Sequence, residues 1–179
     1  MATLKVSDLK KELKELDQKE LIQIITELYK NSKEVKVYLS TMFLGEEAVN
    51  DLYEKTIKAI EDEFFPDRGF GKLRLAEAKK AITTFKKITN DEIKTIDLMI
   101  FYVELGTEYT VTYGDISERF YTSMESMYEK VLTSCNEEMF TFFNDRLVGI
   151  LEASNGIGWG YHDSLEDIYY SNAPLIEED

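Results

Sequence analysis

Apolar residues recur at helical spacing along almost the whole chain, and this periodicity constrains the fold more than any other feature. Leu21, Ile24, Ile25 and Leu28, for example, fall on one side of a helix. Proline, which interrupts helices, occurs only twice in 179 residues. The sequence therefore predicts an all-α fold, in which eight or nine helices pack as helical hairpins within one irregular domain spanning residues 1–179.

Helix boundaries are marked by capping residues. Asp17 and Asp115 are each followed by a glutamate three residues later, the spacing of a capping box, and Asn136 is a third predicted N-cap. Between about residues 91 and 105 apolar side chains surround the helix axis, which predicts a central, buried helix. Residues 109–113 alternate like a strand but have no partner strand nearby, so we interpret them as the frayed or bent end of that helix.

Negative charge is concentrated in the second half of the chain. Residues 1–100 carry 18 basic and 19 acidic side chains, whereas residues 101–179 carry only Arg119, Lys130 and Arg146 against 16 acids. The acidic half also holds eight of the eleven tyrosines and the only tryptophan. A net charge of −14 argues against a nucleic-acid partner, because phosphate contacts require a surplus of Lys and Arg. We interpret this half as a folded part with a negative surface.

Composition excludes several other classes. A single cysteine, Cys135, cannot form an internal disulfide, and nothing basic beside it lowers its pKa. No apolar run approaches the ~20 residues that a membrane span needs, and the N-terminus has no signal-peptide pattern. The one histidine and the absence of paired Cys or Glu-x-x-His motifs argue against a metal site or cofactor. A cytoplasmic protein with no membrane partner is expected.

Residues 68–87 form a basic segment with seven cationic side chains and one acid. We single out Arg68, Lys72, Arg74, Lys79 and Lys86 as a candidate site for an anion or a protein partner. The lysines share about a third of the helix circumference, and glycines and free helix N–H groups lie beside the arginines. The alternative is that this face is solvated or docks on the acidic half of the same chain.

The glycine-rich stretch 156–163 is the second candidate site, with Trp159, Tyr161, His162 and Asp163. The simpler hypothesis is structural: Trp159 and Tyr161 cover an open end of the helix stack and a hydrogen bond holds His162. The alternative is a ligand or catalytic site in which His162, the one group that titrates near neutral pH, is the general base.

Two stretches are distinctive: FFPDRGFGKLRLAEAKK at residues 64–80, and GIGWGYHD at 156–163 with DIYY at 167–170. Together with FYVELG at 101–106 they resemble a bacterial family of small helical proteins whose function is unknown. The resemblance implies a bacterial, cytoplasmic setting and carries no activity or site residue. The Leu- and Lys-rich opening is also similar to short helix–loop–helix DNA-binding modules, but it lacks their longer glycine-containing loop.

We therefore expect a non-enzymatic protein that acts by binding another macromolecule, with no catalytic residue assigned. One alternative is a small-molecule or phosphate-handling enzyme, in which the Arg68–Arg74 and His162 loops meet in one pocket. The other is an acidic inhibitor of a nucleic-acid-binding protein, which needs regular rows of carboxylates.

Overall fold

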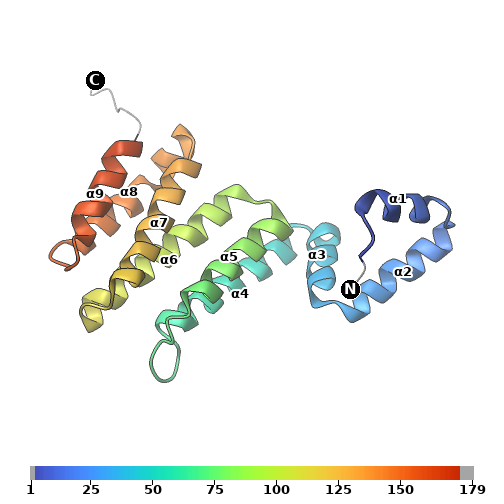
Figure 1. Cartoon of the computed structure of the whole chain (residues 1–179), viewed down its shortest axis with the longest axis horizontal. Helices are drawn as coiled ribbons and strands as arrows, with labels where there is room; N and C mark the ends of the chain where they lie inside the picture. Colours follow the sequence, from blue (N-terminus) through green and yellow to red (C-terminus); the bar gives the residue numbers. More distant parts are fainter. Residues whose placement is uncertain (1–2, 174–179) are drawn as a thin grey trace. The chain divides into compact units, whose positions relative to one another are not determined.

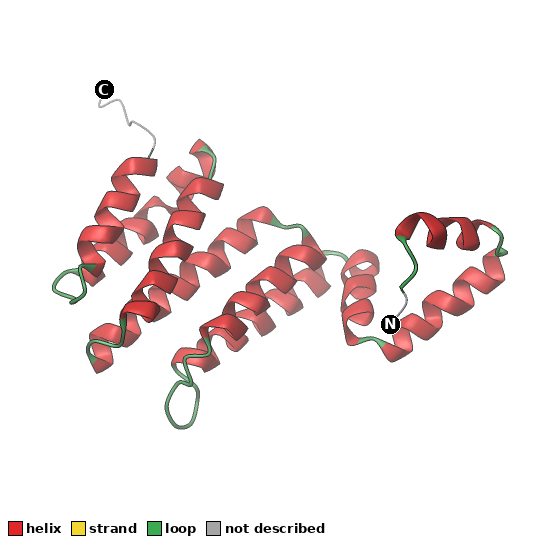
Figure 2. Ribbon diagram, viewed as in Figure 1, coloured by secondary structure: helices red, strands yellow, loops and turns green. Residues whose placement is uncertain are grey.

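The computed structural model describes residues 3–173, and in this range 81% of the chain is helical with no strand (Figure 2). The predicted all-α class is confirmed, with nine helices in the described part. Their bounds are α1 Val6–Lys14, α2 Gln18–Asn31, α3 Lys33–Leu44, α4 Glu46–Phe64, α5 Leu75–Thr89, α6 Glu92–Tyr113, α7 Glu118–Ser134, α8 Glu137–Ser154 and α9 Tyr161–Asn172. No helix in residues 3–173 combines the length and the apolar composition needed to cross a membrane.

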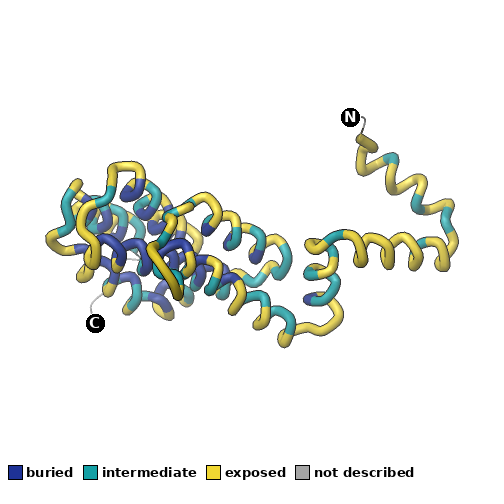
Figure 3. The backbone as a smooth tube through the Cα atoms, turned by 90° about the horizontal axis from the view of Figure 1, so that it is seen from below, coloured by how far each residue is buried: buried dark blue, intermediate teal, exposed yellow. Residues whose placement is uncertain are grey.

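The helices fall into two compact units, residues 1–49 and 50–179, and α4 begins in the first unit and continues into the second. In the first unit α2 packs against α3. Thr41 is the one buried residue among residues 3–49, and most of α1 and α2 is exposed (Figure 3). Twelve of the nineteen large apolar side chains that are exposed in the described part belong to this unit.

The second unit contains the hydrophobic core, and α6 lies at its centre. Twelve residues of α6 are buried, which confirms the prediction of a central helix. It packs against α5, α7 and α8, and α9 packs in turn against α7 and α8 (Figure 1). Aromatic side chains join α4 to this core, because Tyr53 contacts Phe85 of α5 and Phe64 contacts Tyr102 of α6. The change in charge after Ile100 falls inside α6 and is no boundary between units.

Capping residues predicted most of the helix N-termini discussed above correctly, but one was misplaced. The Asp17 side chain accepts the N–H of Glu20 in a complete capping box, and Asn136 caps α8, as predicted. The prediction that Asp115 caps the next helix is wrong, since the N-cap of α7 is Ser117. Asp115 instead accepts hydrogen bonds from the Tyr121 hydroxyl (3.2 Å) and the N–H of Gly158 (3.3 Å). A tertiary contact therefore replaces the local cap.

The end of α6 also differs from the prediction. Residues 109–113 continue the regular helix, which ends at Gly114 with a φ of 86°. The start of this segment is packed: the Thr110 and Tyr121 hydroxyls form a hydrogen bond of 2.6 Å, and the Tyr109 ring lies 5.6 Å from the Phe65 ring at a tilt of 53°. Tertiary packing overrides the strand-like preference of the β-branched residues.

Candidate functional site

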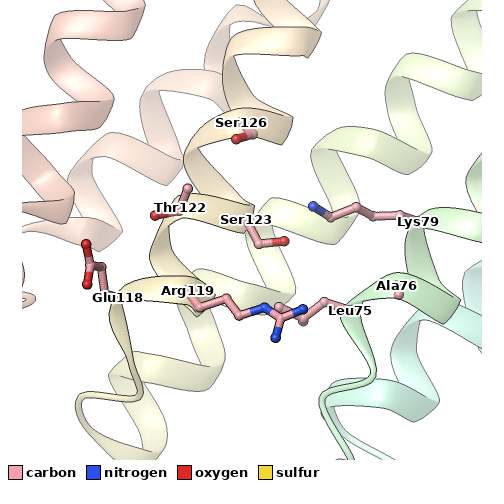
Figure 4. Close-up of a pocket in the computed structure, with 8 residues that line it drawn as sticks. All are labelled: Leu75, Ala76, Lys79, Glu118, Arg119, Thr122, Ser123 and Ser126. Atoms are coloured by element: carbon pink, nitrogen blue, oxygen red, sulfur yellow. The ribbon is translucent and has the colours of Figure 1, made fainter.

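An open groove separates the N-terminal halves of α5 and α7 in the second unit. It consists of two adjoining depressions of about 560 Å³ and 510 Å³, which share Leu75, Ala76 and Arg119 in their walls. Lys79 and Arg119 extend into it from opposite helices, and the α7 wall carries hydroxyl groups (Figure 4). The groove includes Lys79 and Arg74 of the basic segment.

Lys79 lies in this groove, with its amine over the ring of Tyr102. Its Nζ is 5.9 Å from the centre of the buried Tyr102 ring, in a cation–π contact, and the Tyr102 hydroxyl lies 2.9 Å from the Ser123 hydroxyl. Burial, and then the charge of Lys130, lower the pKa of the Lys79 ammonium. Lys79 makes no ion pair with any other residue in the described range. It is therefore a partly desolvated cation whose charge no carboxylate neutralises.

The opposite wall is one polar face of α7. Arg119, Thr122, Ser123, Ser126 and Lys130 lie at helical spacing on this face, and all except Lys130 line the groove. Arg119 is exposed and, within residues 3–173, forms no ion pair. This polar face of α7 was not predicted from the sequence. The signal was present, because two of the three basic residues in the acidic half recur at this spacing with the hydroxyls.

Arg74 lies at one end of the groove but is engaged by Glu63. The Glu63 carboxylate is only 5% exposed, and it accepts from Nε (3.0 Å), Nη2 (2.6 Å) and the backbone N–H (3.1 Å) of Arg74. Gly71 approaches the same turn so closely that a Cβ would lie 2.2 Å from the carbonyl oxygen of Phe64. The ion pair and the glycine together hold the 65–74 loop against the end of α4. Anion binding at Arg74 stays a prediction, and the anion would compete with Glu63.

We expect the Glu63–Arg74 ion pair to make the free energy of unfolding depend on pH. The Arg74 side-chain hydrogen bonds lower the pKa of Glu63 below its ordinary value of 4.5. A lowered carboxyl pKa contributes stability that is present above pH 4.5 and is lost as the pH falls through the folded value. Urea unfolding of the parent and of Glu63→Gln should therefore show a less stable variant at pH 7. The difference between the two should shrink as the pH falls below 4.5, and a difference that stays constant over that range would contradict the assignment.

The other predicted basic residues lie away from the groove walls. Arg68 is exposed in the 65–74 loop, Lys72 is exposed near the base of that loop, and Lys86 is exposed near the end of α5. The five cations of this candidate site are therefore divided: Lys79 faces the groove, Arg74 holds a loop, and three side chains face solvent. The role of these five residues as an anion or partner site remains a prediction.

Side chains at the end of α8 and within α9 contact His162. Nδ1 of His162 is 2.9 Å from the buried Ser154 hydroxyl, and Nε2 is 3.7 Å from the Glu166 carboxylate. A Cβ on Gly158 would lie 2.5 Å from the Asp115 carboxylate, so a larger residue there would displace the Asp115 side chain. The structural hypothesis expected a backbone or carboxylate hydrogen bond to His162, whereas its hydrogen-bond partner is the Ser154 hydroxyl.

The expected burial of Trp159 is wrong, and Tyr161 is the anchor of this segment. Trp159 is 59% exposed and has a φ of 64°, whereas Tyr161 is fully buried. The Tyr161 hydroxyl pairs with the buried Thr107 hydroxyl at 2.9 Å. A tyrosine satisfies its hydroxyl in the core, while the left-handed turn directs the tryptophan outward. Asp163 is exposed in the first turn of α9.

The two predicted loops do not line the same groove. The depression that Arg74 lines is completed by Ile116, Ser117 and Phe120, and its walls contain none of residues 156–163. Figure 1 shows the α6–α7 connection between the α4–α5 loop and the α8–α9 loop. The enzyme alternative required Arg74 and His162 in one pocket, and this groove does not provide that arrangement.

A second polar cluster joins α4, α6 and α8. Arg146 bonds to both carboxylate oxygens of Glu104, at 2.7 Å and 2.6 Å, and also to Asp97, which in turn accepts from the Tyr53 hydroxyl. No group of three or more His, Cys, Asp or Glu side chains in residues 3–173 is arranged to hold a metal ion. Burial raises the pKa of the Cys135 thiol.

The fold and the groove define a small all-α protein with a cationic, hydroxyl-lined cleft on an acidic molecule. The chain belongs to the family of unknown function DUF6155, whose family model matches residues 4–172. The family thus covers α1 to α9 and both units. Neither the curated proteins nor the solved structures contain a match to it.

Proposed function

We propose that the protein is a non-catalytic binding protein whose α5–α7 groove binds a phosphorylated segment of a partner protein. The observation that carries this proposal is the convergence of Lys79 and Arg119 on one groove, with no carboxylate paired to either among the described residues. A bound anion would neutralise both charges.

The phosphoryl group fits the donors of this groove. It carries nearly two negative charges and three acceptor oxygens at neutral pH. An arginine, a lysine and the hydroxyls of Thr122, Ser123 and Ser126 offer the charged and neutral donors that such an anion needs. Because partial desolvation lowers the pKa of Lys79, an anion bound beside it would restore a favourable environment for its charge.

A protein segment fits better than a nucleic acid or a reacting small molecule. The net charge of −14 repels extended polyanions, whereas one compact anion interacts mainly with charges within the ~8 Å screening length. Two adjoining depressions also provide room for residues on either side of the anion. The residues that line them include no histidine and no cysteine, and the carboxylates in the walls are those of Glu77 and Glu118.

The proposal predicts that phosphoserine peptides bind and that two substitutions remove the binding. The probe is a degenerate pool of nine-residue peptides with a central phosphoserine, measured against the same pool without phosphate. We expect Lys79→Gln and Arg119→Gln each to weaken binding roughly 10- to 100-fold, and the double variant to weaken it more than either, since a charge-assisted hydrogen bond contributes about 1.5–3 kcal/mol. Lys55→Gln, an exposed lysine of α4 outside the basic segment, is the matched control and should bind as the parent does.

Two further dependences follow from the same geometry. Binding should weaken with added salt, and it should decline as the pH rises through the lowered pKa of Lys79, because the neutral amine no longer attracts the anion. Equal affinity for both peptide pools, or unchanged binding by the double variant, would show that the groove does not recognise phosphate.

A further inference from the structure

We propose that the α2–α3 hairpin binds a second copy of this chain through its apolar face. This inference is independent of the α5–α7 groove. The α2–α3 apolar face consists of six side chains, namely Ile22, Ile25, Tyr29, Leu39, Phe43 and Leu44. All except Ile22 line one apolar depression of about 340 Å³ between the two helices, and Ile22 lies one turn before Ile25.

The first unit needs such a partner surface because it has almost no core of its own. Thr41 is the single buried residue in residues 3–49, although α1, α2 and α3 are amphipathic. A helical unit of this size depends on disulfides, a metal or oligomerisation when it cannot bury enough apolar surface. Its residues include no cysteine, and the described part of the chain contains no metal-binding cluster. Of these three ways to stabilise the unit, oligomerisation is the one that remains.

The charge of the hairpin favours a second copy. Residues 18–44 carry four lysines and three glutamates, a net of +1, whereas the whole chain carries −14. Two copies would repel each other through their acidic halves, whereas two near-neutral hairpins can meet without that repulsion. Two amphipathic hairpins with their apolar faces together form a four-helix arrangement, and the contact uses the same patch on both copies.

The exposed apolar area of the α2–α3 apolar face is close to the apolar area that a typical dimer interface buries on each partner. Phe43 is 77% exposed, Leu44 65%, Ile22 57% and Ile25 48%. At roughly 150–250 Å² for a large apolar side chain, the six expose on the order of 500 Å². A stable interface buries about 800 Å² on each partner, of which about 65% is apolar in the core of homodimers. The α2–α3 apolar face alone supplies that apolar share.

Sedimentation equilibrium of the full chain tests the proposal. We expect a mass of twice the 20.8 kDa chain at micromolar concentration. Phe43→Ser should weaken the dimer at least about tenfold, because a truncated aromatic in the centre of an interface is a typical hot spot. Phe142→Ser is the matched control: Phe142 is also helical, in α8, and 73% exposed, and its loss should leave the dimer intact.

Hydrogen exchange supplies a second measurement that does not depend on any variant. Amides of residues 18–44 should become more protected as the protein concentration rises through the dissociation constant. A parent that stays monomeric over the whole range would overturn the proposal and indicate that the face is covered within its own chain or by another protein. A dimer that survives Phe43→Ser, or protection that rises only outside residues 18–44, would overturn it equally.

Discussion

Ile96→Asp is expected to unfold the second unit. Ile96 is 3% exposed on α6, the helix around which α5, α7 and α8 pack. A carboxylate at this position would be buried without a partner, and the loss of the apolar side chain would add to the cost. We expect a loss of more than about 4 kcal/mol in the free energy of unfolding, which approaches the total stability of an ordinary domain.

Ile93→Asp is the matched control, since Ile93 belongs to the same helix but is 53% exposed. Its expected effect is within about 0.5 kcal/mol, the range of ordinary surface substitutions. Circular dichroism of both variants and their urea unfolding curves give the comparison. If Ile96→Asp were as stable as Ile93→Asp, α6 would not be the centre of the core.

Tyr161→Ala is expected to be the second most damaging change. The ring is fully buried where α9 begins, it packs 5.1 Å from the Tyr121 ring, and its hydroxyl pairs with Thr107. Removing it leaves a cavity and an unpaired threonine, for which we expect a loss of about 3–5 kcal/mol. Tyr161→Phe keeps the ring and removes only the hydroxyl, so its cost should be on the order of 1–3 kcal/mol.

Trp159→Ala provides the contrast, because the larger side chain two residues earlier is mostly exposed. We expect its effect on stability to be within about 0.5 kcal/mol. Thermal unfolding followed by circular dichroism ranks the three variants. A ranking in which Trp159→Ala is the most damaging would restore the sequence-based hypothesis that the tryptophan closes the helix stack.

Structural features that depend on residues close together in sequence were predicted correctly, because caps and helical spacing act within a few residues. The Asp17 capping box and the burial of α6 followed directly from the pattern. The failures concern partners that lie far along the chain. Asp115 had the right spacing for a cap, but its carboxylate bonds to Gly158, which is 43 residues away and which local rules do not consider.

The same limit applies to the candidate site. Helical spacing placed Lys79 on a polar face, but it did not reveal that Tyr102 lies beneath its amine or that Arg119 faces it from α7. Spacing shows which side chains share a face of one helix. It does not show which neighbouring helix covers that face, and the groove exists only through the packing of α5 beside α7 on α6.

The exposure of Trp159 has a practical consequence for spectroscopy of this protein. The chain has one tryptophan, and its indole is largely in water while the core is folded. Its fluorescence should therefore already emit near the wavelength of a solvated indole in the native state and shift little on unfolding. Tryptophan emission would report on the 155–160 loop, and the buried tyrosines, among them Tyr102, Tyr121 and Tyr128, would be the chromophores that follow the loss of the core.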